Sequence, residues 1–133
     1  MEDALLAALL ADAGIAAIVG DRIAWGLLPQ ADELPALVLH RITGGFDYVQ
    51  DGRVDTITPL VQVDCWAGSY GGAKTLARAV MAALPAISAD PFQDCSVIDE
   101  RDDGEAADGP AADRSESFFR TSLDVRVCIT PNA

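Results

Sequence analysis

Residues 60–84 have the sequence LVQVDCWAGSYGGAKTLARAVMAAL, in which an apolar run passes through a glycine-rich turn into an alanine- and leucine-rich stretch. The pattern predicts a strand that ends near Trp66 and a helix over about residues 70–84, capped by Ser69 and ended by Pro85. The residues on the apolar face of this helix are Ala73, Leu76, Ala77, Val80 and Leu84. The sequence shows one such crossover, whereas a doubly wound parallel sheet needs helices between nearly all of its strands.

The turn in this segment nearly matches a phosphate-binding loop. The Walker A pattern G-x-x-x-x-G-K-[ST] begins at Gly68 and ends at Thr75, and Ala73 replaces its second glycine. The methyl group of Ala73 would crowd the backbone where phosphates approach, and Ala73 also belongs to the apolar helix face. We therefore expect Lys74 to lie in solvent. A small ligand- or nucleotide-binding enzyme that uses this turn is the alternative function.

Upstream of this segment the sequence predicts a long β-hairpin. Residues 36–43 form a β run, and a polar segment that starts at Gly44 leads into a return strand over residues 56–66. Residues 44–56 are expected to protrude as a two-stranded arm, which is marginal alone and gains stability by packing on a partner. Pro59 cannot donate a ladder hydrogen bond, so an edge or a bulge is expected there.

Downstream of the segment, residues 97–100 are predicted to form a short strand, and the acidic, glycine- and alanine-rich residues 101–114 a mobile loop. The C-terminal strand is the clearest element, because apolar and polar residues alternate along it as on a half-buried strand. Its expected core-facing residues are Phe119, Thr121, Leu123, Val125, Val127 and Ile129.

The residue pattern of the N-terminal part predicts helices followed by a strand. Residues 3–11 carry a stripe of leucines behind an acidic start, and Asp12 is placed to cap a second short turn that ends at Gly20. A short strand over residues 22–28 follows. We therefore expect a single α+β domain over residues 1–133: a mostly antiparallel sheet with two main helices packed on it and a protruding β-hairpin.

The composition argues against broad nucleic-acid binding. The 133 residues include 21 aspartates and glutamates but only 9 lysines and arginines, which gives a net charge of −12. Such a charge opposes binding to nucleic-acid phosphates. It is compatible with the lining of a channel through which DNA passes without binding. The apolar residues 4–19 follow an acidic start and are too short for a membrane span, so we expect no targeting segment and no membrane partner.

No catalytic, metal or cofactor site is expected. The cysteines Cys65, Cys95 and Cys128 form no C-x-x-C pair, and His40 is the single histidine. We interpret His40 as a polar residue on a sheet face. Cys65 and Cys128 are interpreted as small buried hydrophobes of a protein that assembles in the reduced state inside the cell. The aspartates of residues 47–55 lack the alternate spacing of a calcium loop.

Taken in order, these features resemble the tail completion or tail terminator proteins of long-tailed bacteriophages and of phage-like gene transfer agents. The resemblance spans nearly the whole chain, and its least typical part is the acidic stretch over residues 101–114. The matching stretches are the N-terminal leucine-rich helix, IVGDRI (18–23), LPQ (28–30), LPALV (34–38), RITG (41–44), VQVDCWA (61–67), the helix with Ala73, Leu76 and Ala77, and FRTSLDVRV (119–127).

The resemblance implies a structural subunit without catalysis or cofactor. Such subunits close into a homo-hexameric ring at the head-proximal end of the tail tube, at the head–tail junction of a virion or virus-like particle assembled in the bacterial cytoplasm. The implied partners are the tail tube protein and the neck or head-completion connector protein, and double-stranded DNA passes through the bore without specific binding. Another tail or head-completion subunit of the same particle is a further alternative.

We expect subunit and partner contacts in the hairpin arm and in the acidic loop, because such segments gain order by packing on a neighbour. The candidate contact residues are Gly44, Gly45, Phe46, Asp47, Tyr48, Asp51, Arg53, Asp102, Asp103, Glu105 and Asp108.

Overall fold

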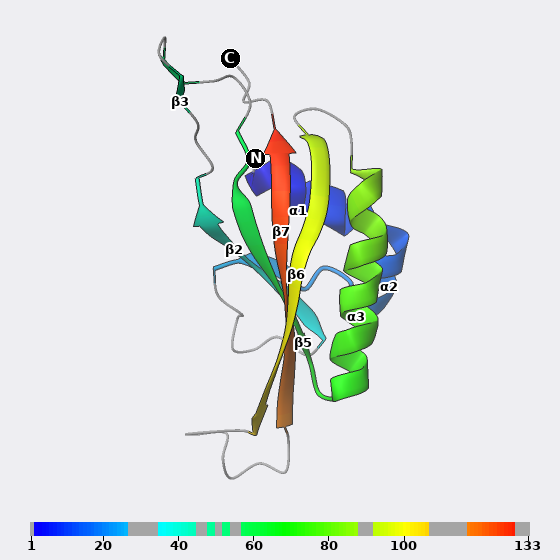
Figure 1. Ribbon diagram of the computed structural model, residues 1–133. Helices are drawn as coiled ribbons and strands as arrows, with labels where there is room; N and C mark the ends of the chain where they lie inside the picture. Colours follow the sequence, from blue (N-terminus) through cyan, green and yellow to red (C-terminus); the bar gives the residue numbers. More distant parts are fainter. Residues whose placement is uncertain are drawn as a thin grey trace.

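A five-stranded sheet forms one layer of the molecule, and helices pack on one of its faces (Figure 1). The computed structural model describes residues 2–26, 35–44, 48–49, 52–53, 57–87, 92–106 and 117–129. The strands of the sheet are β1 (Ile23–Trp25), β2 (Ala36–Thr43), β5 (Leu60–Ala67), β6 (Phe92–Ala106) and β7 (Ser117–Ile129). The helices are α1 (Glu2–Ala11), α2 (Ala13–Val19) and α3 (Tyr70–Ala83), and a 3-10 turn, η1 (Leu84–Ala86), follows α3.

The strand order is β1-β2-β5-β7-β6, and the pairing confirms the prediction of a mostly antiparallel α+β fold. β2, β5, β7 and β6 pair antiparallel in turn, whereas β1 lies parallel to β2. α3 is the crossover between β5 and β6, and it packs against β5 and β7 (Figure 1). Within the described part of the chain, no helix is both long and apolar enough to cross a membrane.

The core lies between the helices and the sheet and is mainly aliphatic. The largest fully buried side chains include Leu5, Leu9, Ile15, Leu37, Leu39, Leu76, Leu84 and Leu123. Each such side chain stabilises the fold by about 1.5–3 kcal/mol relative to full exposure. Cys65 is buried in this core, as predicted. Cys128 is only half-buried, contrary to the prediction, because the alternation along β7 places it on the opposite face of the sheet from Val127.

The helix ends follow the predicted capping residues. The carboxylate of Asp12 accepts a hydrogen bond from the backbone N–H of Ile15 at 2.9 Å, and α2 ends at Gly20 with a φ of 60°. At the start of α3, the hydroxyl of Ser69 accepts from the backbone N–H of Gly72 at 3.0 Å. Polar caps therefore fix where two of the three helices begin.

The acidic segment corrects one sequence prediction. Residues 101–106 were expected to start a mobile loop, but they continue β6, which pairs with β7 as far as Ala106 opposite Ser117. The last two residue pairs of this ladder extend beyond Ala67, the end of β5. The rest of the predicted loop, residues 107–114, lies outside the described residues. β1 is also shorter than the predicted strand over residues 22–28.

The predicted hairpin is only partly described. β3 (Tyr48–Val49) and β4 (Gly52–Arg53) pair antiparallel as a separate two-stranded sheet. The protrusion of the arm stays a prediction, because several of residues 44–56 lie outside the described part. At its base, the ladder between β2 and β5 shifts register between Arg41 and Thr43, so the extra residue is Ile42 on β2, and Pro59 lies directly before β5 rather than in a bulge.

Candidate assembly surfaces

The predicted contact residues lie in two separate regions of the structure. Gly44 directly follows β2, and the backbones of Tyr48 and Arg53 pair with each other in the small sheet. Asp102, Asp103 and Glu105 belong to β6 rather than to a loop. The predicted contact residues that lie outside the described residues are Gly45, Phe46, Asp47, Asp51 and Asp108.

Asp102 is joined to the start of α3 by a cluster of polar side chains, which we call the Lys74 cluster: Tyr70, Lys74, Glu100, Asp102 and Thr121. The ammonium group of Lys74 lies 2.6 Å from a carboxylate oxygen of Asp102 and 3.1 Å from one of Glu100. The hydroxyls of Tyr70 and Thr121 donate to the two oxygens of Asp102, at 2.8 Å and 3.2 Å. Lys74 is therefore engaged with β6, and the prediction that it lies in solvent is wrong.

The Lys74 cluster shifts the protonation equilibria of its members. The hydrogen bond from Lys74, followed by that from Tyr70, holds the pKa of Asp102 below its ordinary value. The same contacts with Asp102 raise the pKa of Lys74 and of Tyr70. The shifts of Lys74 and Asp102 favour their charged forms, and the raised pKa of Tyr70 keeps its hydroxyl protonated as a hydrogen-bond donor. The cluster ties the part of β6 around Glu100 and Asp102 to α3, and pairing with β7 continues the strand to Ala106.

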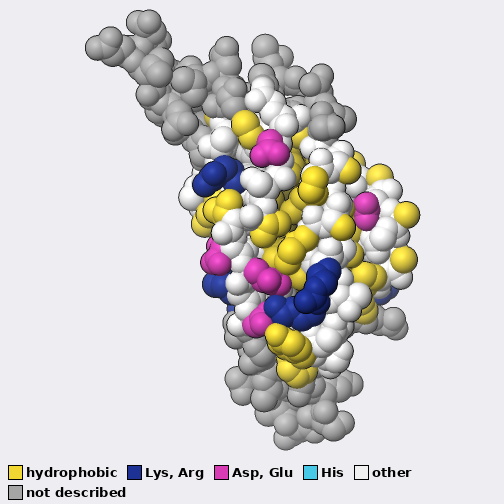
Figure 2. Space-filling view, turned by 45° about the vertical axis from the view of Figure 1, so that its right-hand side comes forward, with side chains coloured by type: hydrophobic (Ala, Val, Ile, Leu, Met, Phe, Trp, Pro, Cys, Tyr) yellow, Lys and Arg dark blue, Asp and Glu magenta, His cyan; other side chains and the backbone are white. Residues whose placement is uncertain are grey.

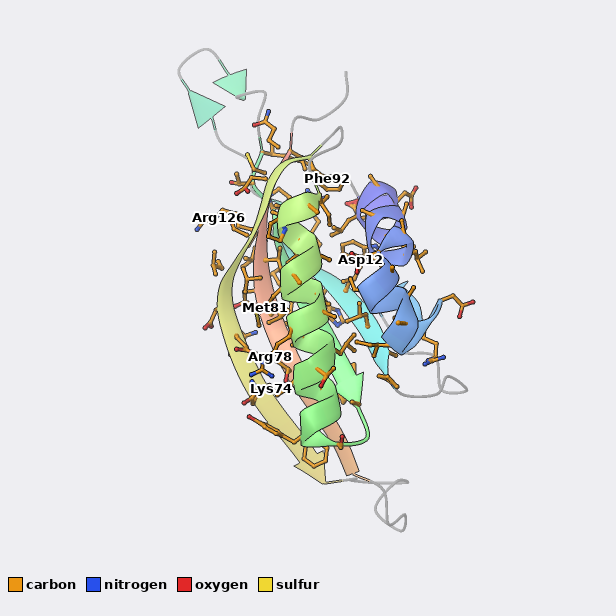
Figure 3. The ribbon with its side chains drawn as sticks, turned by 90° about the vertical axis from the view of Figure 1, so that its right-hand side faces the viewer. Asp12, Lys74, Arg78, Met81, Phe92 and Arg126 are labelled. Atoms are coloured by element: carbon orange, nitrogen blue, oxygen red, sulfur yellow. The ribbon has the colours of Figure 1, made fainter. Side chains whose placement is uncertain are left out.

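Figure 3 shows Lys74, Arg78 and Met81 along the side of α3 that is turned toward β6. The same side of the molecule, seen in Figure 2, gathers basic and acidic side chains next to exposed hydrophobic ones. Tyr70 is 52% exposed and Ile98, on β6, is 47% exposed. This side therefore combines apolar groups, which are typical of the centre of a protein interface, with charged groups, which are typical of its rim.

The sheet face opposite the helices carries a buried carboxylate that the sequence analysis did not single out. Asp64 is only 2% exposed, and it accepts hydrogen bonds from Ser122 at 2.7 Å and from Gln62 at 2.8 Å. Its other oxygen lies 3.3 Å from Nε2 of His40 and 3.9 Å from the guanidinium of Arg120. A buried carboxylate is tolerated only with such partners. His40 thus lies on a sheet face, as predicted.

This arrangement does not activate a nucleophile. In a hydrolase triad the histidine lies between the serine and the acid, so that it can take the serine proton. Here Asp64 lies between Ser122 and His40 and bonds to both. The hydroxyl proton of Ser122 is donated to a carboxylate, which makes the group a structural network across β2, β5 and β7. The signal in the sequence was the acid Asp64 in the largely apolar run over residues 60–67.

A second polar group on this face links β6 to its neighbours. The guanidinium of Arg101 bonds to both carboxylate oxygens of Asp124 and to Asp99 at 3.3 Å. It also donates to the side-chain oxygen of Gln62 at 3.4 Å. The hydrogen bond with Asp124 raises the pKa of Arg101. Three strands, β5, β7 and β6, are joined by these contacts.

The turn that resembles a phosphate-binding loop is occupied by structural contacts. Ser69 uses its hydroxyl to cap α3, and Lys74 faces two carboxylates that would repel a phosphate. A Cβ atom at Gly72 would come within 3.0 Å of the Ser69 hydroxyl, so this glycine serves close packing. In the described residues, no group of three or more His, Cys, Asp or Glu side chains is arranged to hold a metal ion.

Comparison with known proteins identifies the family. The family described as Tail completion protein gp17 matches residues 3–130 of this chain. Among solved structures, a chain from "Virion of native gene transfer agent (GTA) particle" has a similar fold, with a TM-score of 0.69 and 18% sequence identity. The alignment covers 98% of this chain and 95% of that one. No curated protein matches the sequence.

The fold and the family match agree with the resemblance seen in the order of the sequence motifs. The match runs through both helical regions and all strands of the main sheet, so it concerns the whole described architecture. The chain therefore belongs to the family Tail completion protein gp17, and it is a structural component of a virion tail.

Proposed function

We propose that copies of this chain close into a hexameric ring that caps the head-proximal end of the tail tube. In this position the ring ends tube polymerisation and joins the tube to the neck or head-completion connector protein. The observation that carries the proposal is the family match over residues 3–130. The similar fold of a chain from a gene transfer agent virion supports it.

The charge of the chain supports a passage for DNA through the ring. Each copy has a net charge of −12, so a bore lined by part of this charge repels the DNA backbone and gives it no place to bind. We infer that double-stranded DNA passes without specific contacts. The function is mechanical, and no catalytic step is assigned to any residue.

Electron cryo-microscopy of purified particles tests the proposed position. The expected result is density for six copies of this fold between the tail tube and the connector. Light scattering of the concentrated protein is expected to give up to six times the chain mass of 13.9 kDa. Density for the chain at the distal tip, or its absence from the tail, would contradict the proposal.

A thermal-shift measurement with ATP and magnesium separates this function from the nucleotide-binding alternative. A true nucleotide binder is stabilised by its ligand, by about 2.7 kcal/mol at a hundredfold excess over Kd. We expect no change in melting temperature, because Lys74 is held by Glu100 and Asp102. An increase that also requires magnesium and is lost in K74A would support the enzyme instead.

A further inference from the structure

The sheet has two edges that are open over part of their length. β6 lies at one end of the strand order and pairs only with β7 among the described strands. At the other end of the strand order, β1 pairs with β2 only from Leu37 to Leu39. Residues 40–43 of β2 therefore have no partner strand on that side in the described part of the chain. Such edges present backbone groups that can pair with another chain.

Both open edges carry a bulged isoleucine. The ladder between β6 and β7 shifts register between Val97 and Asp99, which leaves Ile98 between them. The ladder between β2 and β5 shifts register between Arg41 and Thr43, which leaves Ile42. Ile98 is 47% exposed and Ile42 is 49% exposed. Two large apolar side chains are thus presented to solvent at opposite edges of one sheet.

The charges of the two edges are complementary. Within β6 the acidic residues are Asp94, Asp99, Glu100, Asp102, Asp103 and Glu105, and Arg101 is the single base. β2 contains His40 and Arg41 and no acid, and the guanidinium of Arg41 lies 2.8 Å from the carboxylate of Glu2. Two β6 edges would repel each other, since like charges on facing strands are destabilising. The acidic edge therefore disfavours a symmetric β6–β6 contact and favours the β2 edge of another copy.

The strand directions also fit. β2, β5, β7 and β6 alternate in direction, so β6 runs antiparallel to β2 within one copy. A neighbour in a similar orientation brings its own β2 alongside β6, again antiparallel. The alternation of the sheet would then continue from one copy to the next. Head-to-tail contacts of this kind, with different surfaces on the two sides, are those that close rings.

We propose that β6 of one copy pairs with residues 40–43 of the next copy, with Ile98 of the first beside Ile42 of the second. This inference rests on the proposed ring, because it names the surfaces through which the ring closes. Its physical basis is twofold. Pairing satisfies exposed backbone groups at both edges, and contact between the two isoleucines removes apolar surface from water.

Cysteine cross-linking in assembled tails tests the pairing. The variants I42C and I98C are made singly and together in a C128S background, because the half-buried Cys128 could react. Cys95 is buried, which raises the pKa of its thiol to about 11, and Cys65 is buried with a raised pKa as well. Neither native thiol forms much thiolate at neutral pH, so both stay unreactive toward a short bismaleimide.

The expected result is a ladder of cross-linked species for the double variant and none for either single variant. The pair L10C and I98C is the matched control, since Leu10 is 38% exposed near the C-terminal end of the helix α1 and belongs to no strand, so this pair should give no ladder. Cross-linking of I98C with itself would overturn the head-to-tail pairing. Tails that contain rings of this chain but give no I42C–I98C product would overturn the inference and leave the proposed function standing. Tails without the chain would overturn both.

A second variant measures the contact without cross-linking. I98D places a carboxylate at an exposed position of the acidic edge, so it should fold normally and weaken self-association by about tenfold or more. L10D is the matched control and should leave self-association unchanged. Circular dichroism reports the fold of both variants, and light scattering reports assembly. Undiminished rings of a folded I98D protein would refute the pairing.

Discussion

At the scale of single residues, Asp64 has the most demanding environment in the sheet. Its carboxylate is 2% exposed, and its partners come from β2, β5 and β7. A carboxylate without these partners would be costly to bury, so the network fixes how the three strands lie against one another. Because the partners are up to 58 residues apart in sequence, periodicity alone could not reveal the group.

Replacing Asp64 tests how much this hydrogen-bond network contributes to the free energy of unfolding. D64A leaves Ser122, Gln62 and His40 without their shared acceptor. We expect the free energy of unfolding to fall by about 2–4 kcal/mol, as measured by urea denaturation at neutral pH. D21A, at an exposed position after α2, is the control and should change it by less than about 0.5 kcal/mol. Equal effects of the two variants would show that the network is energetically unimportant.

The Lys74 cluster makes a pH-dependent contribution to stability through Asp102. Contacts with Lys74 and Tyr70 hold the folded-state pKa of this carboxyl below its ordinary value of 3.8. The stabilisation that Asp102 provides is therefore complete at pH values above the ordinary pKa. It is lost as the pH falls through the folded-state pKa. We expect D102N to be less stable than the native protein at pH near 7, and the difference to vanish in strong acid.

Urea unfolding of the native protein and of D102N across this pH range measures the difference. D21N serves as the control for the general effect of acid on a charged surface. A D102N effect that is as large in strong acid as at neutral pH would mean that the side chain acts through packing rather than through its charge.

At the scale of elements, the start of α3 contains two glycines with different surroundings. A Cβ atom at Gly71 would meet nothing within 4 Å, whereas one at Gly72 would lie 3.0 Å from the Ser69 hydroxyl and 3.2 Å from Ala67. Alanine is favoured over glycine in a helix by about 1 kcal/mol. G71A is therefore expected to stabilise the protein by up to about 1 kcal/mol.

G72A is expected to gain nothing, because crowding at Ser69 and Ala67 costs about 1 kcal/mol or more and disturbs the helix cap. The two variants form a matched pair that differs by one position in the same turn. Thermal unfolding of both measures the difference. If G71A and G72A change the stability equally, the close approach of α3 to the end of β5 does not require glycine at position 72.

The elements that could be predicted are those whose signals are local. The face of α3, its Ser69 cap and the alternation along β7 follow from spacing over a few residues, and the structure confirms them. The continuation of β6 could not be predicted in this way. Residues 101–106 are acidic and lack apolar alternation, and they form a strand because they pair with β7, far away in sequence, while Lys74 holds Asp102. Likewise, the exposure of Ile42 and Ile98 depends on bulges that only the pairing reveals.

At the scale of the whole molecule, assembly must overcome the repulsion between copies that each carry a charge of −12. The reach of this repulsion depends on salt, because the Debye length falls from about 30 Å at 0.01 M to about 8 Å at 0.15 M. At low salt whole molecules repel one another, whereas near physiological salt only charges at the interface still interact. We therefore expect the assembled fraction to rise over this range.

Light scattering at a fixed protein concentration follows the assembled fraction as salt is increased. Replacing Asp21, which is exposed after α2, by lysine lowers the magnitude of the net charge away from the proposed β6–β2 contact. This variant should assemble at lower salt than the native protein and respond less to added salt, because less repulsion remains to be screened. A steady loss of assembly from the lowest salt upward would instead mean that attraction between opposite charges across the interface outweighs the repulsion of the acidic copies.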